Sequence, residues 1–365
     1  MAELETGLPT KKKKKKKKKS LFMSIVTGLI PWKGDSATEI FRKIIFILSL
    51  VILVAAVVIL AGNALKYADL DQNAGVDEQG NETAANAYII DLKNRTPSQE
   101  QIEQLPEGSI NEEYATLYDA NNDFIGWINI PGTNVDYPVM QADDNEYYLH
   151  KDFDGNDLFA GTIFTDYEGV FGPNQMPNNT ILYGHNMLYK YQFSALSNYA
   201  KDINFLTMSP VVDFNTLYQN NKYKIFAVFK TNTNPEHGEV FEYTNYIYFK
   251  NQSEFYNYIC EVMDRSMYET GIDIEYGDEL LTLSTCDAST GFDDMRLVVV
   301  ARKVRENESP DVDTSKFKRK SSIKYFDAYY DVIGNTWKGR TWDVSLVKGM
   351  EEYLRENGLW DEPEE

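Results

Sequence analysis

The sequence has little cysteine and little histidine. Its 365 residues include two cysteines, Cys260 and Cys286, and three histidines. A disulfide framework requires more cysteines in a secreted domain. A single disulfide between these two cysteines is one alternative, but two free thiols with different roles are favoured. The spacings HExxH, CxxC and Asp-x-Asp-x-Asp do not occur, so the sequence predicts neither a metal site nor a cofactor.

Charge is missing from the apolar run Ile44–Ala61, which reads IIFILSLVILVAAVVILA. A helix of these 18 residues is about 27 Å long, close to the ~30 Å hydrocarbon core of a bilayer. A cleaved signal peptide normally has a shorter apolar core behind a short basic segment. We therefore predict an uncleaved transmembrane helix over 44–65.

Basic and acidic residues are divided unequally by this run. Residues 1–43 contain 12 Lys and Arg, nine of them in Lys11–Lys19, and 4 Asp and Glu. The rest of the chain contains 24 basic and 52 acidic residues. Because positive charge stays in the cytoplasm, we predict a cytoplasmic N-terminus and an extracellular domain in a single-pass membrane protein. The lysine run lies beside anionic lipid, so no nucleic-acid partner is predicted.

The changes in composition and charge along the chain predict five segments. These are a cytoplasmic basic arm (1–43), the transmembrane helix (44–65), a polar spacer (66–86), a folded domain (87–305) and a C-terminal extension of unknown role (306–365). In the extension, 306–322 is predicted to be a linker and 344–356 a short amphipathic helix. Its tryptophans, Trp337, Trp342 and Trp360, are expected to pack on the domain, with covering a site or binding a partner as alternatives.

The folded domain is predicted to be mainly β. Pro97 and Pro106 break a helical region before Asn122 into short helices. Later segments have strand patterns: 124–130, 135–140, 163–166, 180–183, 222–231, 280–285 and 297–304. A helix with Ser253 as N-cap is predicted over 253–268. Together these elements indicate a mostly antiparallel barrel or sandwich with N-terminal helices and one inserted helix.

Three side chains follow or begin predicted strands. Cys286 ends the apolar segment LLTLSTCD (280–287), and Arg296 begins RLVVVARK (296–303). If these strands pair as antiparallel neighbours, the thiol and the guanidinium lie at the same end of the sheet. His185 follows another strand in ILYGHNM (181–187), where Gly184 would allow a tight turn.

These residue types suit acyl transfer through a thioester. A thiolate is the nucleophile, an imidazole exchanges the proton, and a guanidinium stabilises the oxyanion. Spacing alone also allows Cys286 to be an inert small hydrophobe, and it supports a function for His185 equally weakly. Asp287 is predicted either to orient Arg296 or His185 or to be a solvated loop acid. No catalytic role is predicted for His150. His237 is expected to be a solvated loop residue, and Cys260 is expected to be structural.

The motifs TLSTCD, with an arginine ten residues on, and LYGHNM resemble the active-site motifs of sortases. The segments 126–153 and 161–167, and the inserted helix, resemble class B sortases in particular. The resemblance covers about 86–304. It implies a closed sortase-like β-barrel in which Cys286 is the nucleophile, His185 the general acid/base, and Arg296 the stabiliser of substrate and oxyanion.

The same resemblance implies a function and partners. A sortase of this class would cleave the sorting signal of a surface protein after a threonine. It would then transfer the acyl fragment to an amine of a peptidoglycan precursor or a pilin, in a Gram-positive-type envelope. Two alternatives stay open: a surface-anchored thiol hydrolase, and a non-catalytic surface interaction protein with the same fold.

Overall fold

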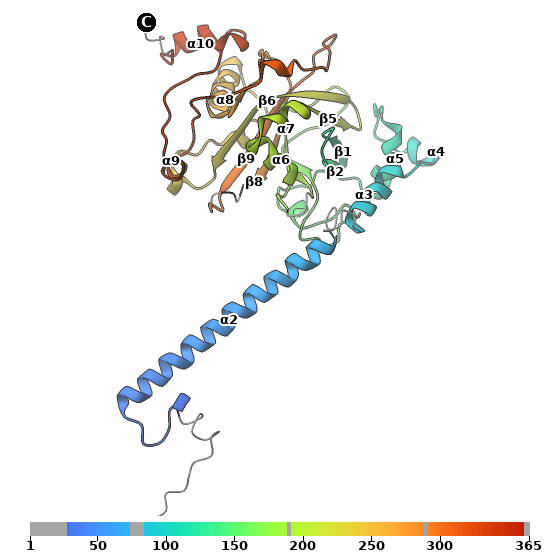
Figure 1. The fold of residues 1–365 in the computed structure, drawn as a ribbon. Helices are drawn as coiled ribbons and strands as arrows, with labels where there is room; N and C mark the ends of the chain where they lie inside the picture. Colours follow the sequence, from blue (N-terminus) through green and yellow to red (C-terminus); the bar gives the residue numbers. More distant parts are fainter. Residues whose placement is uncertain (1–27, 74–83, 188–190, 288, 290, 361–365) are drawn as a thin grey trace, which may run out of the picture. The chain divides into compact units, whose positions relative to one another are not determined.

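The computed structural model describes residues 28–73, 84–187, 191–287, 289 and 291–360, without the side chains of 60–73 and 84–86. The chain divides into two compact units, residues 1–69 and 70–365. Figure 1 shows a long helix in the first unit and a β-barrel with surrounding helices in the second.

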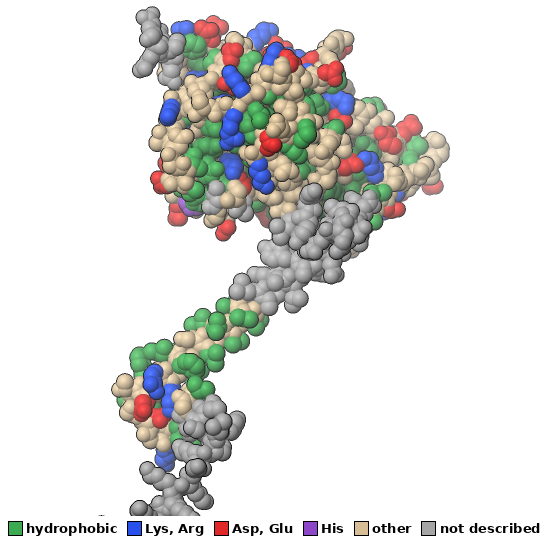
Figure 2. Space-filling view, viewed as in Figure 1, with side chains coloured by type: hydrophobic (Ala, Val, Ile, Leu, Met, Phe, Trp, Pro, Cys, Tyr) green, Lys and Arg blue, Asp and Glu red, His purple; other side chains and the backbone are tan. Residues whose placement is uncertain are grey.

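The first unit is dominated by helix α2 (Ala37–Asn73). Its part Ala37–Ile59 is long and apolar enough to cross a membrane. Figure 2 shows hydrophobic side chains over this part, with Lys and Arg near its beginning. There, Lys43 Nζ lies 2.7 Å from a carboxylate oxygen of Asp35. The helix also enters the predicted spacer 66–86, because extending an existing helix adds one hydrogen bond per residue. Residues 74–83 of that spacer lie outside the described residues.

Eight strands close the barrel that the resemblance implies; the sequence predicted seven of them and missed the strand at 211–216. Their spatial order is β1-β2-β3-β4-β8-β9-β6-β5. The strands are β1 (Phe124–Asn129), β2 (Asp136–Met140), β3 (Phe164–Thr165), β4 (Asn179–Tyr183), β5 (Val211–Thr216), β6 (Asn220–Asn232), β8 (Leu280–Cys286) and β9 (Met295–Lys303). Neighbours are antiparallel except for β2 with β3 and β4 with β8, which are parallel. The closed order excludes the sandwich alternative.

Short helices precede and interrupt the barrel. Before β1 come α3 (Ala84–Asn94), α4 (Gln99–Glu103), η1 (Glu112–Tyr114) and α5 (Ala115–Ala120). Pro97 lies between α3 and α4, and Pro106 lies between α4 and η1. Between β4 and β5 lie η4 (Phe193–Ala195), α6 (Leu196–Lys201) and α7 (Ile203–Met208), which the sequence did not predict. Further 3-10 turns are η2 (Tyr147–Leu149), η5 (Pro235–His237) and η6 (Tyr243–Asn245).

The inserted helix is α8 (Gln252–Arg265), and its cap differs from the prediction. Asn251 has extended backbone angles, and its side-chain oxygen accepts a hydrogen bond of 2.9 Å from the backbone N–H of Glu254. Ser253 already lies inside the first turn, so the N-cap is Asn251. The end of the predicted helical segment instead forms strand β7 (Tyr268–Glu269).

The C-terminal extension packs on the domain in several places. Strand β10 (Lys318–Arg319) pairs with β7, within the stretch predicted to be a linker. Helix α9 (Asp327–Ile333) follows η7 (Thr314–Lys316) and β10, and helix α10 (Met350–Glu356) follows η8 (Val344–Leu346). Figure 1 places α10 beside α8. Trp342 is buried and donates from Nε1 to Asp264 Oδ1 at 2.7 Å, whereas Trp337 is exposed.

Candidate active site

Strands β8 and β9 place Cys286 beside Arg296. The two residues are directly paired in the antiparallel register, at the end of the hairpin next to its connecting loop. Every other residue of β8 is buried, whereas Cys286 is exposed and its thiol is free. The backbone carbonyl of Cys286 accepts a 2.9 Å hydrogen bond from Asn186 Nδ2. The predicted antiparallel pairing that places Cys286 and Arg296 at one end of the sheet is therefore present.

Parallel pairing of β4 with β8 brings His185 to the same end of the barrel. Tyr183 is paired with Ser284, and the Gly184 N–H donates to the Ser284 carbonyl at 3.2 Å. The Thr285 hydroxyl donates back to the Gly184 carbonyl at 2.7 Å. In a parallel pair both chains leave the sheet in the same direction, so the residues after β4 and those ending β8 meet.

A cavity of about 270 Å³ is lined by all three predicted site residues. Its wall also includes side chains from β3, β4, β8 and the turn η6, among them Phe164, Tyr183, Ser284 and Tyr243. The Tyr243 hydroxyl lies 2.6 Å from Ser284 Oγ, which fixes the wall beneath the thiol-bearing strand end. Cys286, His185 and Arg296 thus face one common space.

The ring of His185 is oriented by a backbone carbonyl. Its Nε2 lies 3.0 Å from the Leu149 carbonyl oxygen. A carbonyl can only accept, so Nε2 holds the proton of the neutral ring and Nδ1 holds the lone pair. Burial lowers the pKa of His185, and the nearby His150 lowers it further. The hydrogen bond to the Leu149 carbonyl raises it, but the net pKa is lowered. The imidazole is therefore a neutral group at physiological pH, able to accept a proton at Nδ1.

Gly184 is required for space and not for a left-handed backbone, because its φ lies outside that region. A Cβ there would lie 2.7 Å from Cδ2 and 2.9 Å from Cγ of the buried Phe193 ring. The predicted tight turn at this glycine is thus replaced by close packing beneath His185.

Replacing Gly184 by Ala is expected to destabilise the fold by about 1–3 kcal/mol, because an added methyl group overpacks a filled core. Urea unfolding of the Gly184→Ala variant measures this loss. Gly172→Ala is the matched control, since a Cβ at Gly172 meets nothing within 4 Å. Equal stabilities of the two variants would contradict the packing role.

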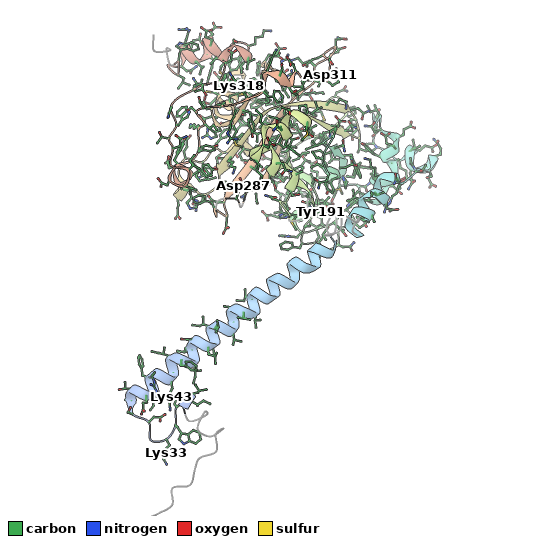
Figure 3. The ribbon with its side chains drawn as sticks, in the orientation of Figure 1. Lys33, Lys43, Tyr191, Asp287, Asp311 and Lys318 are labelled. Carbon is green, nitrogen blue, oxygen red and sulfur yellow. The ribbon has the colours of Figure 1, made fainter. Side chains whose placement is uncertain are left out.

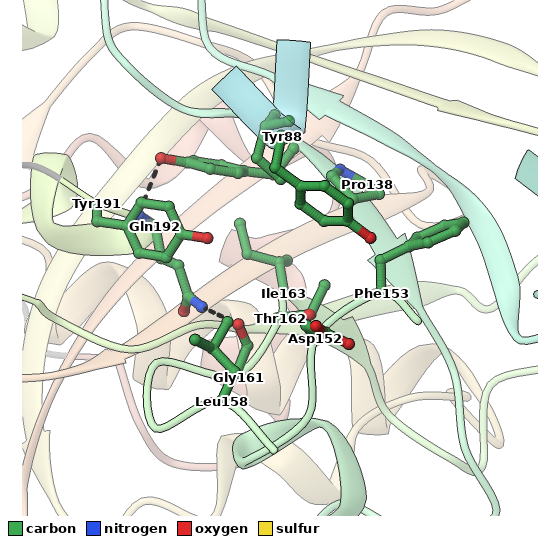
Figure 4. Close-up of a pocket in the computed structure, with 12 residues that line it drawn as sticks. Tyr88, Pro138, Asp152, Phe153, Leu158, Gly161, Thr162, Ile163, Tyr191 and Gln192 are labelled. Carbon is green, nitrogen blue, oxygen red and sulfur yellow. Dashed lines mark hydrogen bonds between the residues drawn. The ribbon is translucent and has the colours of Figure 1, made fainter. Parts of the chain in front are cut away.

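Gln192 links the histidine loop to a second cavity. Its Oε1 accepts from the His185 N–H at 2.8 Å, and its Nε2 donates to the carbonyls of Ala160 and, at 2.8 Å, Gly161. Its own N–H donates to the Tyr137 hydroxyl at 3.1 Å. Figure 4 shows the bond from Gln192 to Gly161 at the wall of a mostly apolar cavity of about 200 Å³. No pattern in the sequence pointed to this buried glutamine.

Asp287 pairs with Lys230 and orients neither Arg296 nor His185. Lys230 Nζ lies 2.7 Å from Asp287 Oδ2, and both side chains are at least nine-tenths buried. Asp287 lies at the end of β8 (Figure 3). Burial raises the pKa of this carboxyl, but bonds from Lys230 and Ser289 outweigh it and lower the pKa overall. Both sequence alternatives for Asp287 are therefore wrong.

Replacing Lys230 by Met is expected to cost about 3–5 kcal/mol of stability at neutral pH, because Asp287 becomes an unpaired buried charge. The lowered Asp287 pKa stabilises the fold above its unfolded-state pKa of about 3.9, and this contribution disappears as the pH falls through the folded-state pKa. The difference in unfolding free energy between the variant and the wild type should therefore decrease at acidic pH. Lys222→Met on the same strand removes a more exposed pair with Asp213 and should cost at most about 1 kcal/mol.

The remaining histidines and the second cysteine occupy different surroundings. The exposed ring of His150 lies 6.2 Å from that of His185, centroid to centroid. His237 contacts Asp294 at 2.9 Å from Nδ1 and is not simply solvated. Cys260 is buried, and burial together with Asp264 raises its pKa to about 12, as a structural thiol requires. Within the described residues, no three His, Cys, Asp or Glu side chains are grouped to hold a metal ion.

Comparison with known proteins identifies the family. Residues 128–304 match the sortase domain family. Sortase B of Listeria monocytogenes is 33% identical over 198 residues, covering 54% of this chain and 76% of that protein. Sortase B of Staphylococcus aureus is 29% identical with the same coverage.

Solved structures of class B sortases are also similar to this chain. The Staphylococcus aureus sortase B–substrate complex aligns with a TM-score of 0.51 and 25% identity over 61% of this chain and 97% of that chain. A mutant form of Clostridium perfringens sortase B aligns with a TM-score of 0.50 and 30% identity over 60% and 97%. This chain therefore combines similarity to these proteins with a closed barrel. At one end of the barrel, a thiol, an imidazole and a guanidinium line the same cavity. The chain belongs to the class B sortases.

Proposed function

We propose that this protein is a membrane-anchored transpeptidase in which Cys286 is the nucleophile, His185 the general acid/base and Arg296 the oxyanion stabiliser. The observation that supports this most is the single cavity lined by these three residues. The exposed thiol is the attacking atom, and the guanidinium of its paired neighbour supplies fixed charge where the oxyanion develops.

The proposed reaction has two acyl transfers. Neutral His185 first takes the proton of the Cys286 thiol. The resulting thiolate attacks the carbonyl carbon of a threonine in the sorting signal, and a C–S bond forms as the C–N bond breaks. The protonated His185 gives its proton to the leaving amine. An incoming amine then attacks the thioester, His185 takes the proton from that amine, and the Cys286 thiolate leaves.

The proposed substrates are surface proteins that contain a sorting signal, and the proposed acceptor is a primary amine of the cell wall or of a pilin. Two solved structures support these classes. One is a sortase B–substrate complex, and another is sortase B complexed with triglycine, whose terminal amine is an acceptor-like group.

The proposed location is the cell membrane, with the N-terminus in the cytoplasm and the catalytic domain outside. The apolar part of α2 supports a single span. The basic residues in the sequence before it support this orientation, because they are retained on the cytoplasmic side. An external domain would meet substrates on the side of the membrane where they emerge.

The test uses the full-length protein in detergent with candidate sorting peptides, with and without triglycine. Mass spectrometry should find an acyl adduct on Cys286 and an amine-dependent ligated product. Cleavage that releases only the free acid would instead support the thiol hydrolase alternative. Absence of both adduct and cleavage, across peptides ending in varied Thr-containing signals, would support the non-catalytic alternative.

A further inference from the structure

The C-terminal extension lies outside the family match and packs on the active-site end of the barrel. Helix α9 lies against η5, and Phe326 and Tyr329 pack with Phe292 and Met295 of the loop 287–295. This loop joins β8 to β9 and ends on the first residue of β9; its residues 288 and 290 lie outside the described residues. The contact is close, because a Cβ on Gly238 would lie 2.6 Å from the backbone nitrogen of Asp327. The Phe326 ring meets the Phe292 ring of the loop edge-on, at 5.6 Å between centroids.

Met295 provides the first link between the extension and the site. Its side chain is fully buried in one hydrophobic cluster with Phe326 and Tyr329. Its backbone carbonyl accepts from the Asp287 N–H at 2.9 Å and from Arg296 Nη1 at 3.2 Å. One residue held by the extension therefore fixes both the guanidinium and the residue after the nucleophile.

Lys230 provides a second, independent link. Its Nζ lies 5.6 Å from the ring centroid of Tyr329, within the range of a cation–π contact. The same Nζ lies 2.7 Å from Asp287 Oδ2 and 3.0 Å from Ser289 Oγ. The ring of Tyr329 thus lies against the ion pair that holds the chain directly after Cys286.

We propose that Phe326 and Tyr329 are positioning residues, through which the C-terminal extension clamps the loop 287–295 and sets Cys286 and Arg296 in their reactive geometry. This role rests on the proposed function. Loops with few packing contacts open locally at low free-energy cost. An oxyanion donor displaced by about 1 Å can lose a factor of ~100 in rate, so a loop joining nucleophile to donor needs such support.

The test compares two double variants of the full-length protein. The clamp variant is Phe326→Ala with Tyr329→Ala. The control is Met350→Ala with Leu354→Ala, which empties fully buried positions of α10 in a different hydrophobic cluster. In the clamp variant, kcat for peptide ligation should fall about 10-fold to 100-fold with little change in KM. Hydrogen exchange in peptides covering 287–295 should accelerate.

The control variant should lose thermal stability but keep its kcat and its exchange rates in 287–295. Tyr329→Phe keeps the ring over Lys230 and should retain wild-type kcat. A clamp variant with wild-type kcat and unchanged exchange would overturn the proposal, and so would an equal kcat loss in the control. If wild-type protein forms no ligated product, the proposed function fails, while exchange and the iodoacetamide alkylation rate of Cys286 still test the clamp.

Discussion

Replacing Cys286 by Ala is expected to abolish both cleavage and ligation of sorting peptides. The variant removes the only exposed thiol among the described residues and leaves the β8–β9 pairing intact, because the side chain of Cys286 projects out of the core. Loss of a covalent nucleophile typically costs several orders of magnitude in kcat. Product formation followed by mass spectrometry, together with the absence of the acyl adduct, measures this effect.

Cys260→Ala is the matched control for that experiment. Cys260 is buried on α8, and its raised pKa keeps it a protonated thiol. This variant should keep ligation activity, and it loses the packing of one small side chain together with the contact of Cys260 Sγ with Arg340 Nη2 at 3.0 Å. A Cys286→Ala variant with residual ligation above background would remove Cys286 from its proposed role, and loss of activity in both variants with a lowered melting temperature would indicate misfolding instead.

Replacing Arg296 by Gln is expected to lower kcat by about 10²–10³, which corresponds to roughly 3–4 kcal/mol of transition-state stabilisation from one oxyanion donor. Arg296 lines the same cavity as Cys286 and lies next to it across the strand pair. Arg296→Lys keeps the positive charge but loses the planar fork of donors, so its kcat should fall by less. Steady-state ligation kinetics separate kcat from KM.

Lys303→Gln serves as the control because Lys303 lies at the opposite end of β9, where it pairs with Glu279 at 2.8 Å. It should leave kcat unchanged. If Arg296→Gln altered only the melting temperature, with kcat preserved, Arg296 would be a structural residue of the β8–β9 pair.

Sequence reasoning located the strand ends that form the site. The apolar segments before Cys286 and after Arg296 have the pattern of buried strands, and neighbouring strands along the chain commonly pair. The predicted pairing of these two residues is therefore confirmed by the register. The roles of Cys286, Arg296 and His185 in catalysis stay predictions.

Long-range contacts explain what sequence reasoning missed. The pairing of β4 with β8 joins residues about a hundred positions apart, and no local pattern encodes that register. Strand β5 follows Pro210 and contains the polar residues Asp213 and Asn215, which weakened its strand pattern. The partner of Asp287 is also distant, because Lys230 belongs to β6. Such ion pairs depend on tertiary packing and leave no spacing signal.

The parallel pairing of β4 with β8 also constrains the order of folding. Its hydrogen bonds close a loop of about a hundred residues, from Asn186 to Cys286. Contacts of such high sequence separation form late, because loop-closure entropy opposes them until other structure is in place. Synthesis from the N-terminus produces His185 about a hundred residues before Cys286. The site that joins these residues is therefore complete only after nearly the whole domain has been synthesised.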